Sequence, residues 1–151
     1  MNEIVLLKLG EVVLKGLNRR SFEDKLMANI RRRIQHCGAF SVCSKQSTIY
    51  VEPQEDGCDM DGAYAACRQV FGVIAVTRAR PCAKDKDAIL NCAKAYLDGE
   101  LRAAKSFKVE TKRADKLFPM TSMEISQYVG GLLHEAYPHL QVDVHTPELC
   151  V

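Results

Sequence analysis

The chain has 151 residues, of which 47% are hydrophobic and 26% charged, and its formal net charge is +2. This length fits one domain or two small ones with a buried core, and so small a net charge does not by itself mark a nucleic-acid-binding protein. The apolar run near the N-terminus is bracketed by Glu3 and Lys8 and is too short for a targeting sequence or a membrane span. We therefore expect a cytoplasmic protein with no membrane association.

The first half of the chain predicts a compact α+β domain. An apolar run over residues 4–9 indicates a buried strand, and apolar residues at helical spacing after Asn18 indicate a helix that ends at Gly38. The remaining elements of this half are predicted as strand, strand, helix and strand over residues 40–43, 48–52, 61–71 and 73–77. The order βαββαβ is that of a ferredoxin-like domain, which we place at residues 1–78.

Residues 79–151 predict a second, smaller domain. Its expected elements are a helix, a strand, a helix and a strand over residues 84–101, 107–112, 122–136 and 142–144. The chain then ends at Val151, where another strand would begin. Two strands make a poor sheet by themselves. We therefore expect that the chain is a fragment, or that another molecule completes its sheet.

The most informative stretch joins the strand and the helix in the middle of this second domain. Lys112, Arg113 and Lys116 lie beside Phe118, and Thr121 begins a helix with a capping-box spacing. Cations, an aromatic ring and a helix N-terminus together suit a phosphate backbone with an unpaired base stacked nearby. The alternative is a solvated loop with its phenylalanine packed inward, and the spacing alone leaves both open.

Positive charge is concentrated in two segments. Residues 15–33 contain seven Lys or Arg and two acids, residues 102–116 contain six and two, and no Lys or Arg follows. Charge segregated in this way can build a basic face on a nearly neutral protein. The arginines at positions 31–33 fit such a face, and they also fit an ordinary solvated helix surface.

The cysteines do not indicate a metal site or a catalytic thiol. The chain has seven, and no two are separated by only two residues, so neither a zinc knuckle nor a redox pair is predicted. An odd number of cysteines favours reduced thiols. A small thiol enzyme or sulfur carrier remains an alternative function, although no neighbouring pattern of histidine and aspartate supports it.

Several motifs, in order, resemble one family. These are Gly10-Glu11, Lys15-Gly16-x-Asn18-Arg19-x-x-Phe22, Val70-Phe71-Gly72-Val73, Lys112-Arg113-x-x-Lys116-x-Phe118-Pro119-Met120, Gly130-Gly131, and Val142-Asp143-Val144-His145-x-Pro147. In this order and spacing they resemble the opening of bacterial tRNA sulfurtransferases of the ThiI family, which make 4-thiouridine in tRNA and are linked to thiamine biosynthesis. The resemblance implies a ferredoxin-like domain over residues 1–78 and a THUMP domain, truncated at its C-terminal strands, over residues 79–151.

The resemblance also implies a partner and a set of contacts. The two domains together would hold the acceptor end of tRNA, including its unpaired 3′ CCA tail. By position, the RNA-binding residues would be Lys112, Arg113, Lys116 and Phe118, supported by Lys15, Asn18 and Arg19 on the first domain.

The chain departs from the family at the catalytic step. The family uses ATP and Mg²⁺ in a later domain, at a loop of the type Ser-Gly-Gly-x-Asp-Ser, and receives sulfur as a persulfide from a cysteine desulfurase. No such loop occurs in the 151 residues. We therefore expect no cofactor, metal or catalytic residue in this chain, and no activity from it alone.

Two other functions fit the same residues. THUMP domains also occur on other tRNA-modifying enzymes, so the chain would then be an RNA-binding region with a different chemistry. In the second alternative, the ferredoxin-like part is an assembly module. An exposed sheet edge can pair with a second copy of the chain and form a homodimer.

Overall fold

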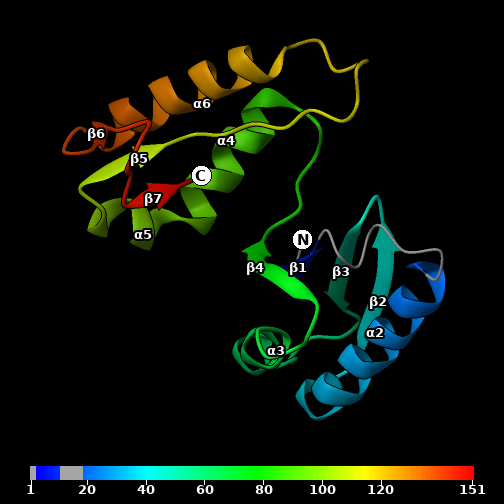
Figure 1. Ribbon diagram of the computed structural model, residues 1–151. Helices are drawn as coiled ribbons and strands as arrows, with labels where there is room; N and C mark the ends of the chain where they lie inside the picture. Colours follow the sequence, from blue (N-terminus) through cyan, green and yellow to red (C-terminus); the bar gives the residue numbers. More distant parts are fainter. Residues whose placement is uncertain (1–2, 11–18) are drawn as a thin grey trace. The chain divides into compact units, whose positions relative to one another are not determined.

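The structure is a computed structural model that describes residues 3–10 and 19–151. The chain divides into two compact units, residues 1–81 and residues 82–151. Figure 1 shows both units, and each is described here by itself. Among the described residues, no helix is both long enough and apolar enough to cross a membrane.

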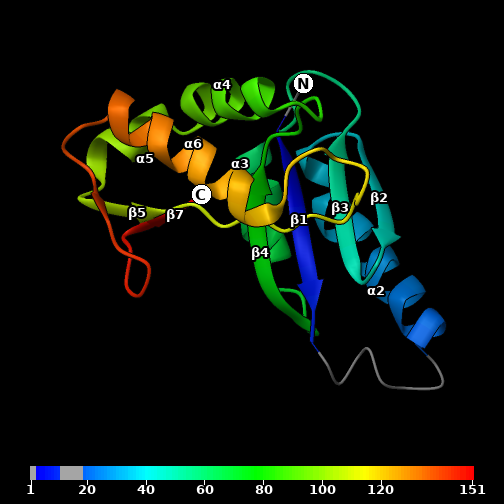
Figure 2. The same cartoon turned by 90° about the horizontal axis from the view of Figure 1, so that it is seen from above.

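Unit 1 contains a four-stranded antiparallel sheet. Its elements in chain order are β1 (Ile4–Leu9), α2 (Arg19–Ile34), the short 3-10 helix η1 (Gln35–Cys37), β2 (Phe40–Lys45), β3 (Thr48–Pro53), α3 (Met60–Cys67) and β4 (Val73–Ala79). The strand order is β2-β3-β1-β4, with β1 and β3 in the centre and β2 and β4 at the edges. Figure 2 shows α2 and α3 behind the sheet. This is the ferredoxin-like arrangement that the sequence predicts.

The core of unit 1 follows from two sequence periods. Alternate residues of β1, including Val5 and Leu7, are fully buried toward the helices, whereas Lys8 is exposed. From α2, Leu26, Ile30 and Ile34 are buried at a spacing of four. These side chains form one apolar cluster between the sheet and its two helices.

The second helix of unit 1 is shorter than predicted. The sequence predicts a helix over residues 61–71, but α3 ends at Cys67. The amide of Val70 donates instead to the carbonyl of Cys67 at 3.3 Å in a turn, and Gly72 follows with a φ of 92°. Val70 is still buried, so the apolar pattern continues past the end of the helix and misleads the sequence prediction.

Unit 2 packs three helices with a three-stranded parallel sheet. Its elements are α4 (Lys86–Tyr96), α5 (Asp98–Ala103), β5 (Ser106–Lys108), α6 (Ser122–Ala136), β6 (Gln141–Val142) and β7 (Leu149–Cys150). The strand order is β6-β5-β7, and both pairings are parallel. Its core gathers around Phe107, Leu101, Leu133 and Leu140, each almost fully buried.

Two predictions for unit 2 are wrong in detail. One helix is predicted over residues 84–101, but the chain breaks at Leu97 and restarts as α5. Asp98 then accepts a hydrogen bond from the Tyr137 hydroxyl at 2.6 Å, and the new helix buries Leu101. The expectation of only two strands is also wrong, because β7 pairs with β5 and makes a third.

The strand predicted over residues 107–112 is mostly an extended segment without a partner strand. The ladder of β5 covers only Ser106–Lys108, although the amide of Glu110 still donates to the carbonyl of Val151 at 2.9 Å. Thr111 accepts a hydrogen bond from Ser126 on α6 at 2.8 Å. The alternating pattern therefore reflects a segment packed on a helix as well as a strand.

Candidate nucleic-acid interface

The basic loop, defined as residues 109–121, connects β5 to α6. Within it, Nη1 of Arg113 donates to the carbonyl oxygens of Phe118 and Met120, at 3.3 and 3.1 Å. The half-buried Arg113 thus links the first part of the loop to residues 118 and 120 in its last part. Arg113, predicted as an RNA contact, has a clear structural role in fixing the shape of this loop.

Asp115 forms the second fixed point of the basic loop. Its carboxylate accepts the amide of Leu117 at 3.0 Å and pairs with Nζ of Lys84 at 3.2 Å, and its carbonyl accepts the amide of Phe118 at 3.2 Å. The hydrogen bond from the Leu117 amide, and then the charge of Lys84, hold the pKa of this carboxyl below its ordinary value. Asp115 is therefore ionised at neutral pH and keeps the turn closed.

The two lysines of the basic loop are its free charges. Lys112 and Lys116 are exposed, and neither has a hydrogen bond or ion pair among the described residues. A loop held by Arg113 and Asp115 thus presents two ammonium groups to solvent. That arrangement suits phosphate groups, which lysine binds as a point charge.

Phe118 takes the inward position that the sequence analysis leaves open. It is half-buried and packs against the core of unit 2. Leu117, beside it, is 93% exposed and is the apolar side chain that the loop presents to solvent. Base stacking on Phe118 stays a prediction, with only the uncovered part of its ring to support it.

The N-terminus of α6 is already capped by its own side chains. Thr121 accepts the amide of Glu124 at 3.2 Å, and the Glu124 carboxylate accepts the Thr121 amide at 3.3 Å. The predicted capping box is therefore confirmed. A carboxylate at this end competes with any added anion, so the helix dipole contributes less to phosphate binding than the sequence pattern indicates.

The predicted residues of unit 1 are only partly described. Lys15 and Asn18 lie outside the described residues. Arg19 begins α2, where its Nε donates to the carboxylate of Glu23 at 3.1 Å and its guanidinium also donates to the Ser47 hydroxyl. Arg19 belongs to unit 1 and the basic loop to unit 2, so their joint surface stays a prediction.

Two cations at the start of α4 are not among the predicted site residues, and one of them contacts the basic loop. Lys84 reaches the loop through Asp115. Lys86 lies over the ring of Tyr128, with Nζ 4.8 Å from the ring centre, and the Tyr128 hydroxyl donates to Asp87. Lys84-Asp85-Lys86 begins the helix predicted over residues 84–101, and this position is the only sequence signal for the two lysines. The loop and the start of α4 together hold more positive charge than the loop alone.

The thiols show no sign of activation in the part of the chain that the structure describes. All seven cysteines are free. Burial raises the pKa of the Cys67 thiol to about 11, and burial also raises the pKa of Cys82. Both are protonated at neutral pH and are weak nucleophiles, because the thiolate is the reactive form.

Two observations concern metal and phosphate binding by the described residues. No group of three or more His, Cys, Asp or Glu side chains in residues 3–10 and 19–151 is placed to hold a metal ion. The one adjacent glycine pair in the sequence, Gly130-Gly131, lies inside α6 and not in a loop after a strand. Backbone amides of a helix interior are already bonded and cannot cradle a phosphate.

Both units match known family models. Residues 4–77 match the ThiI ferredoxin-like domain, and residues 83–151 match the THUMP domain. The chain belongs to the ThiI family. Its relatives include a probable tRNA sulfurtransferase of Acetivibrio thermocellus, which is 43% identical over 150 residues, covering 98% of this chain and 38% of the relative. A second, from a Thermoanaerobacter species, is 38% identical over 149 residues and covers 99% of this chain and 38% of the relative.

Solved structures share the same fold. A crystal structure of a 4-thiouridine synthetase–RNA complex with bound ATP matches with a TM-score of 0.80 and 22% identity, over 99% of this chain and 37% of that one. The protein PH1313 from Pyrococcus horikoshii matches with a TM-score of 0.81 and 23% identity, over 99% of this chain and 49% of that one. The chain therefore spans 37–38% of the length of the two sulfurtransferases and the 4-thiouridine synthetase, and 49% of PH1313.

Proposed function

We propose that this chain is the tRNA-binding part of a tRNA sulfurtransferase that makes 4-thiouridine, and that it holds the acceptor end of tRNA with its unpaired 3′ CCA tail. The observation that carries the proposal is a pair of exposed lysines, Lys112 and Lys116, which have no partner in the part of the chain that the structure describes and lie on a loop fixed by Arg113 and Asp115. A THUMP-type unit, relatives named tRNA sulfurtransferases and a similar fold crystallised with RNA support it.

Binding would draw on two physical terms. Lysines that neutralise phosphates release the counterions condensed on the nucleic acid, so affinity falls as salt rises. Unpaired bases at the end of the tRNA add stacking on apolar or aromatic surface. Leu117 and the uncovered part of Phe118 supply that surface beside the lysines.

The chemical step is assigned to residues beyond this chain. The chain spans 38% of its curated relatives, and its sequence has no phosphate-binding loop after a strand. ATP with Mg²⁺ would be bound by the rest of a longer enzyme, and a cysteine desulfurase would deliver sulfur there. In this proposal the two units described here select and position the RNA.

The test compares tRNA affinities of charge-matched variants. Lys112→Ala with Lys116→Ala should weaken binding of an unmodified tRNA transcript and lower the slope of log affinity against log salt by about 1.5, because two phosphate contacts are lost. The control is Lys94→Ala with Lys105→Ala, which removes two exposed cations elsewhere in unit 2. Equal affinities of the two double variants would show that the basic loop is not the site.

The acceptor-end assignment has its own test. A transcript trimmed of its 3′ tail should bind more weakly than the intact one, because the unpaired bases and their phosphates are gone. The basic-loop variant should lose this difference, since both changes remove the same contact. If trimmed and intact transcripts bind the wild-type chain equally, RNA is held elsewhere than at its 3′ end.

A second candidate function is assembly through the sheet of unit 1. The outer edge of β4 has no partner strand among the described residues. Next to it Phe71 is 87% exposed and Ile74 71% exposed, and large apolar side chains beside a free edge favour pairing with a second copy. Light scattering should then show a dimer that Phe71→Ser with Ile74→Ser converts to a monomer. A monomeric wild-type chain would rule this function out.

A further inference from the structure

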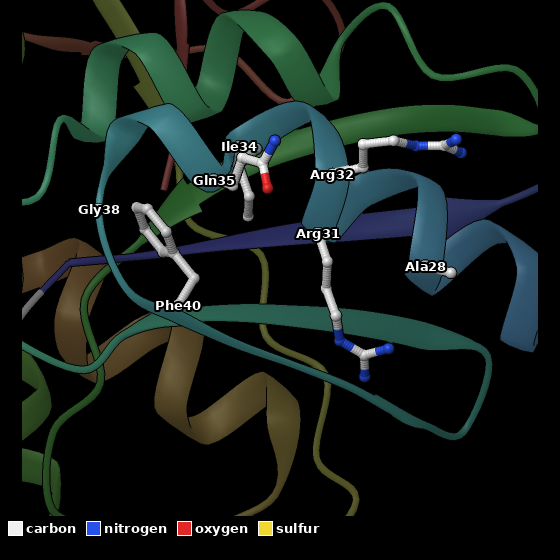
Figure 3. A pocket seen from close by; sticks show the side chains of 7 residues that line it. All are labelled: Ala28, Arg31, Arg32, Ile34, Gln35, Gly38 and Phe40. Atoms are coloured by element: carbon white, nitrogen blue, oxygen red, sulfur yellow. The ribbon is translucent and has the colours of Figure 1, made fainter.

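A hollow on unit 1 carries a charge pattern that the basic loop does not explain. It has a volume of about 470 Å³ and lies between the last turns of α2 and the start of the edge strand β2 (Figure 3). That volume is within the range of about 300–1,000 Å³ typical of small-ligand sites. Arg31 and Arg32 lie along one wall, and Phe40 lies at the end where β2 begins.

The helical wall of the hollow comes from α2 and the start of η1. Ala28, Arg31 and Arg32 are spaced i, i+3 and i+4, which places them on one face of α2, and Gln35 follows as the first residue of η1. Ala28 has the smallest side chain of the four.

The two arginines differ in what they bind. Nη2 of Arg31 donates to the carbonyl of Val42 on β2 at 2.9 Å, which fixes the guanidinium at the sheet edge. Arg32 is exposed and has no partner among the described residues. Figure 3 shows Arg31 reaching toward the strands while Arg32 projects away from the same turn. One cation is thus preorganised, and the next is free to close on an anion.

Few acids compete for these arginines along the helix. The acids of α2, Glu23 and Asp24, lie near its beginning, and Glu23 is already paired with Arg19. The carboxylate of Glu55 accepts the amide of Ala39 at 3.3 Å, beyond the end of the helix. The hollow therefore keeps its positive charge.

Phe40 adds an aromatic surface to this positive charge. It is half-buried, because part of its ring packs on the core of unit 1 while the rest lines the hollow. Arginine beside an aromatic ring is the combination with which proteins hold unpaired nucleotides without reading their sequence, by phosphate contact and base stacking.

We propose that this hollow binds one unpaired nucleotide of the bound RNA, with its phosphate at Arg31 and Arg32 and its base against Phe40. The proposal rests on the proposed function, because it takes the ligand of the whole chain to be RNA. It adds a contact on unit 1 that is separate from the basic loop of unit 2. Binding an RNA strand at both places would increase affinity through the effective concentration of the second contact.

A single tryptophan can report on the hollow directly. The chain has no tryptophan, so Phe40→Trp introduces the only one. Its fluorescence should be quenched when a saturating unmodified tRNA transcript places a base on the ring. Phe71→Trp, at an exposed position of the same unit, is the control and should not be quenched.

A matched pair of neighbouring arginines tests the phosphate contact. Arg32→Gln should lower the salt slope of tRNA binding by about 0.7 and abolish the quenching of Phe40→Trp. Arg33→Gln makes the same charge change on the other flank of α2, where Arg33 donates to Asn29 at 3.4 Å, and should leave both unchanged. Arg32 has no partner within residues 3–10 and 19–151, so its loss should not affect thermal unfolding.

The outcomes separate this proposal from the function on which it rests. The hollow site would be overturned if tRNA did not quench the fluorescence of Phe40→Trp, or if Arg32→Gln and Arg33→Gln had the same effect on quenching and salt slope. In either case the proposed function would stand as long as tRNA binding still depended on Lys112 and Lys116. Quenching that survives loss of those two lysines would support the hollow and count against the basic loop. A chain that binds no tRNA would overturn both.

Discussion

Replacing Arg113 by methionine tests whether this residue shapes the basic loop or contacts RNA. The change keeps a long side chain and removes the donor that joins the carbonyls of Phe118 and Met120. Hydrogen bonds from charged donors contribute about 1.5–3 kcal/mol when buried, and Arg113 is only half-buried, so we expect the two together to contribute roughly 2 kcal/mol to closing the loop. That corresponds to a factor of about 30 in the opening equilibrium.

Amide hydrogen exchange measures this opening at the residues concerned. The amides of Leu117 and Phe118 are bonded to Asp115 in the closed loop and should exchange about 30-fold faster in Arg113→Met. Lys112→Met, a neighbouring change at an exposed side chain that bonds to none of the described residues, should leave them at the wild-type rate. Wild-type exchange in Arg113→Met would refute the structural role. If the salt slope of tRNA binding also fell by one phosphate contact, Arg113 would be an RNA ligand as first predicted.

The remaining predictions concern single positions. Thr121→Ala removes the cap of α6 and should cost about 1 kcal/mol of stability in urea unfolding. Gly131→Ala should stabilise by roughly 0.8 kcal/mol, because its Cβ meets nothing within 4 Å on a helix, and unchanged stability would contradict this. Gly38→Ala should destabilise, since its φ is 131° and its Cβ would lie 2.7 Å from the sulfur of Cys58. Asp115 has a lowered pKa, so the turn it closes should persist above its ordinary pKa of about 4 and open as pH falls below it, and Asp115→Asn should remove this pH dependence of Leu117 exchange.

The elements that the sequence predicts well are those fixed by neighbouring residues. The bounds of α6 follow from a capping box at Thr121 and Glu124 and from apolar residues at helical spacing, and both signals lie within the helix itself. The strand β1 likewise matches its apolar run of residues 4–9. In both cases the local pattern and the packed structure agree, so no distant residue has to be known.

The predictions that fail depend on residues far apart in sequence. At Leu97 the local signal for a break, Asp98-Gly99, stands among helix-forming residues, and the break coincides with the hydrogen bond from Tyr137 to Asp98, 39 positions away. The pairing of β7 with β5 joins segments about 40 residues apart. Single-sequence patterns carry no information on such pairings.

The candidate site shows the same limit at the level of side chains. The sequence groups Lys112, Arg113 and Lys116 as equivalent cations, since charge is all that a pattern of letters records. The folded loop separates them, because Nη1 of Arg113 donates to two carbonyls of the loop while the lysines stay solvated.

This division of roles has an energetic consequence for RNA affinity. A loop that is ordered before RNA arrives avoids most of the entropy cost of fixing its side chains on binding, about 0.5–1.5 kcal/mol for each immobilised long side chain. Solvated lysines cost the fold nothing, whereas buried ones would need partners. Arg113 and Asp115 should therefore influence tRNA affinity as strongly as Lys112 and Lys116 do, while leaving the salt slope unchanged. Affinity and salt slope together thus distinguish the residues that hold the loop from those that bind the phosphates.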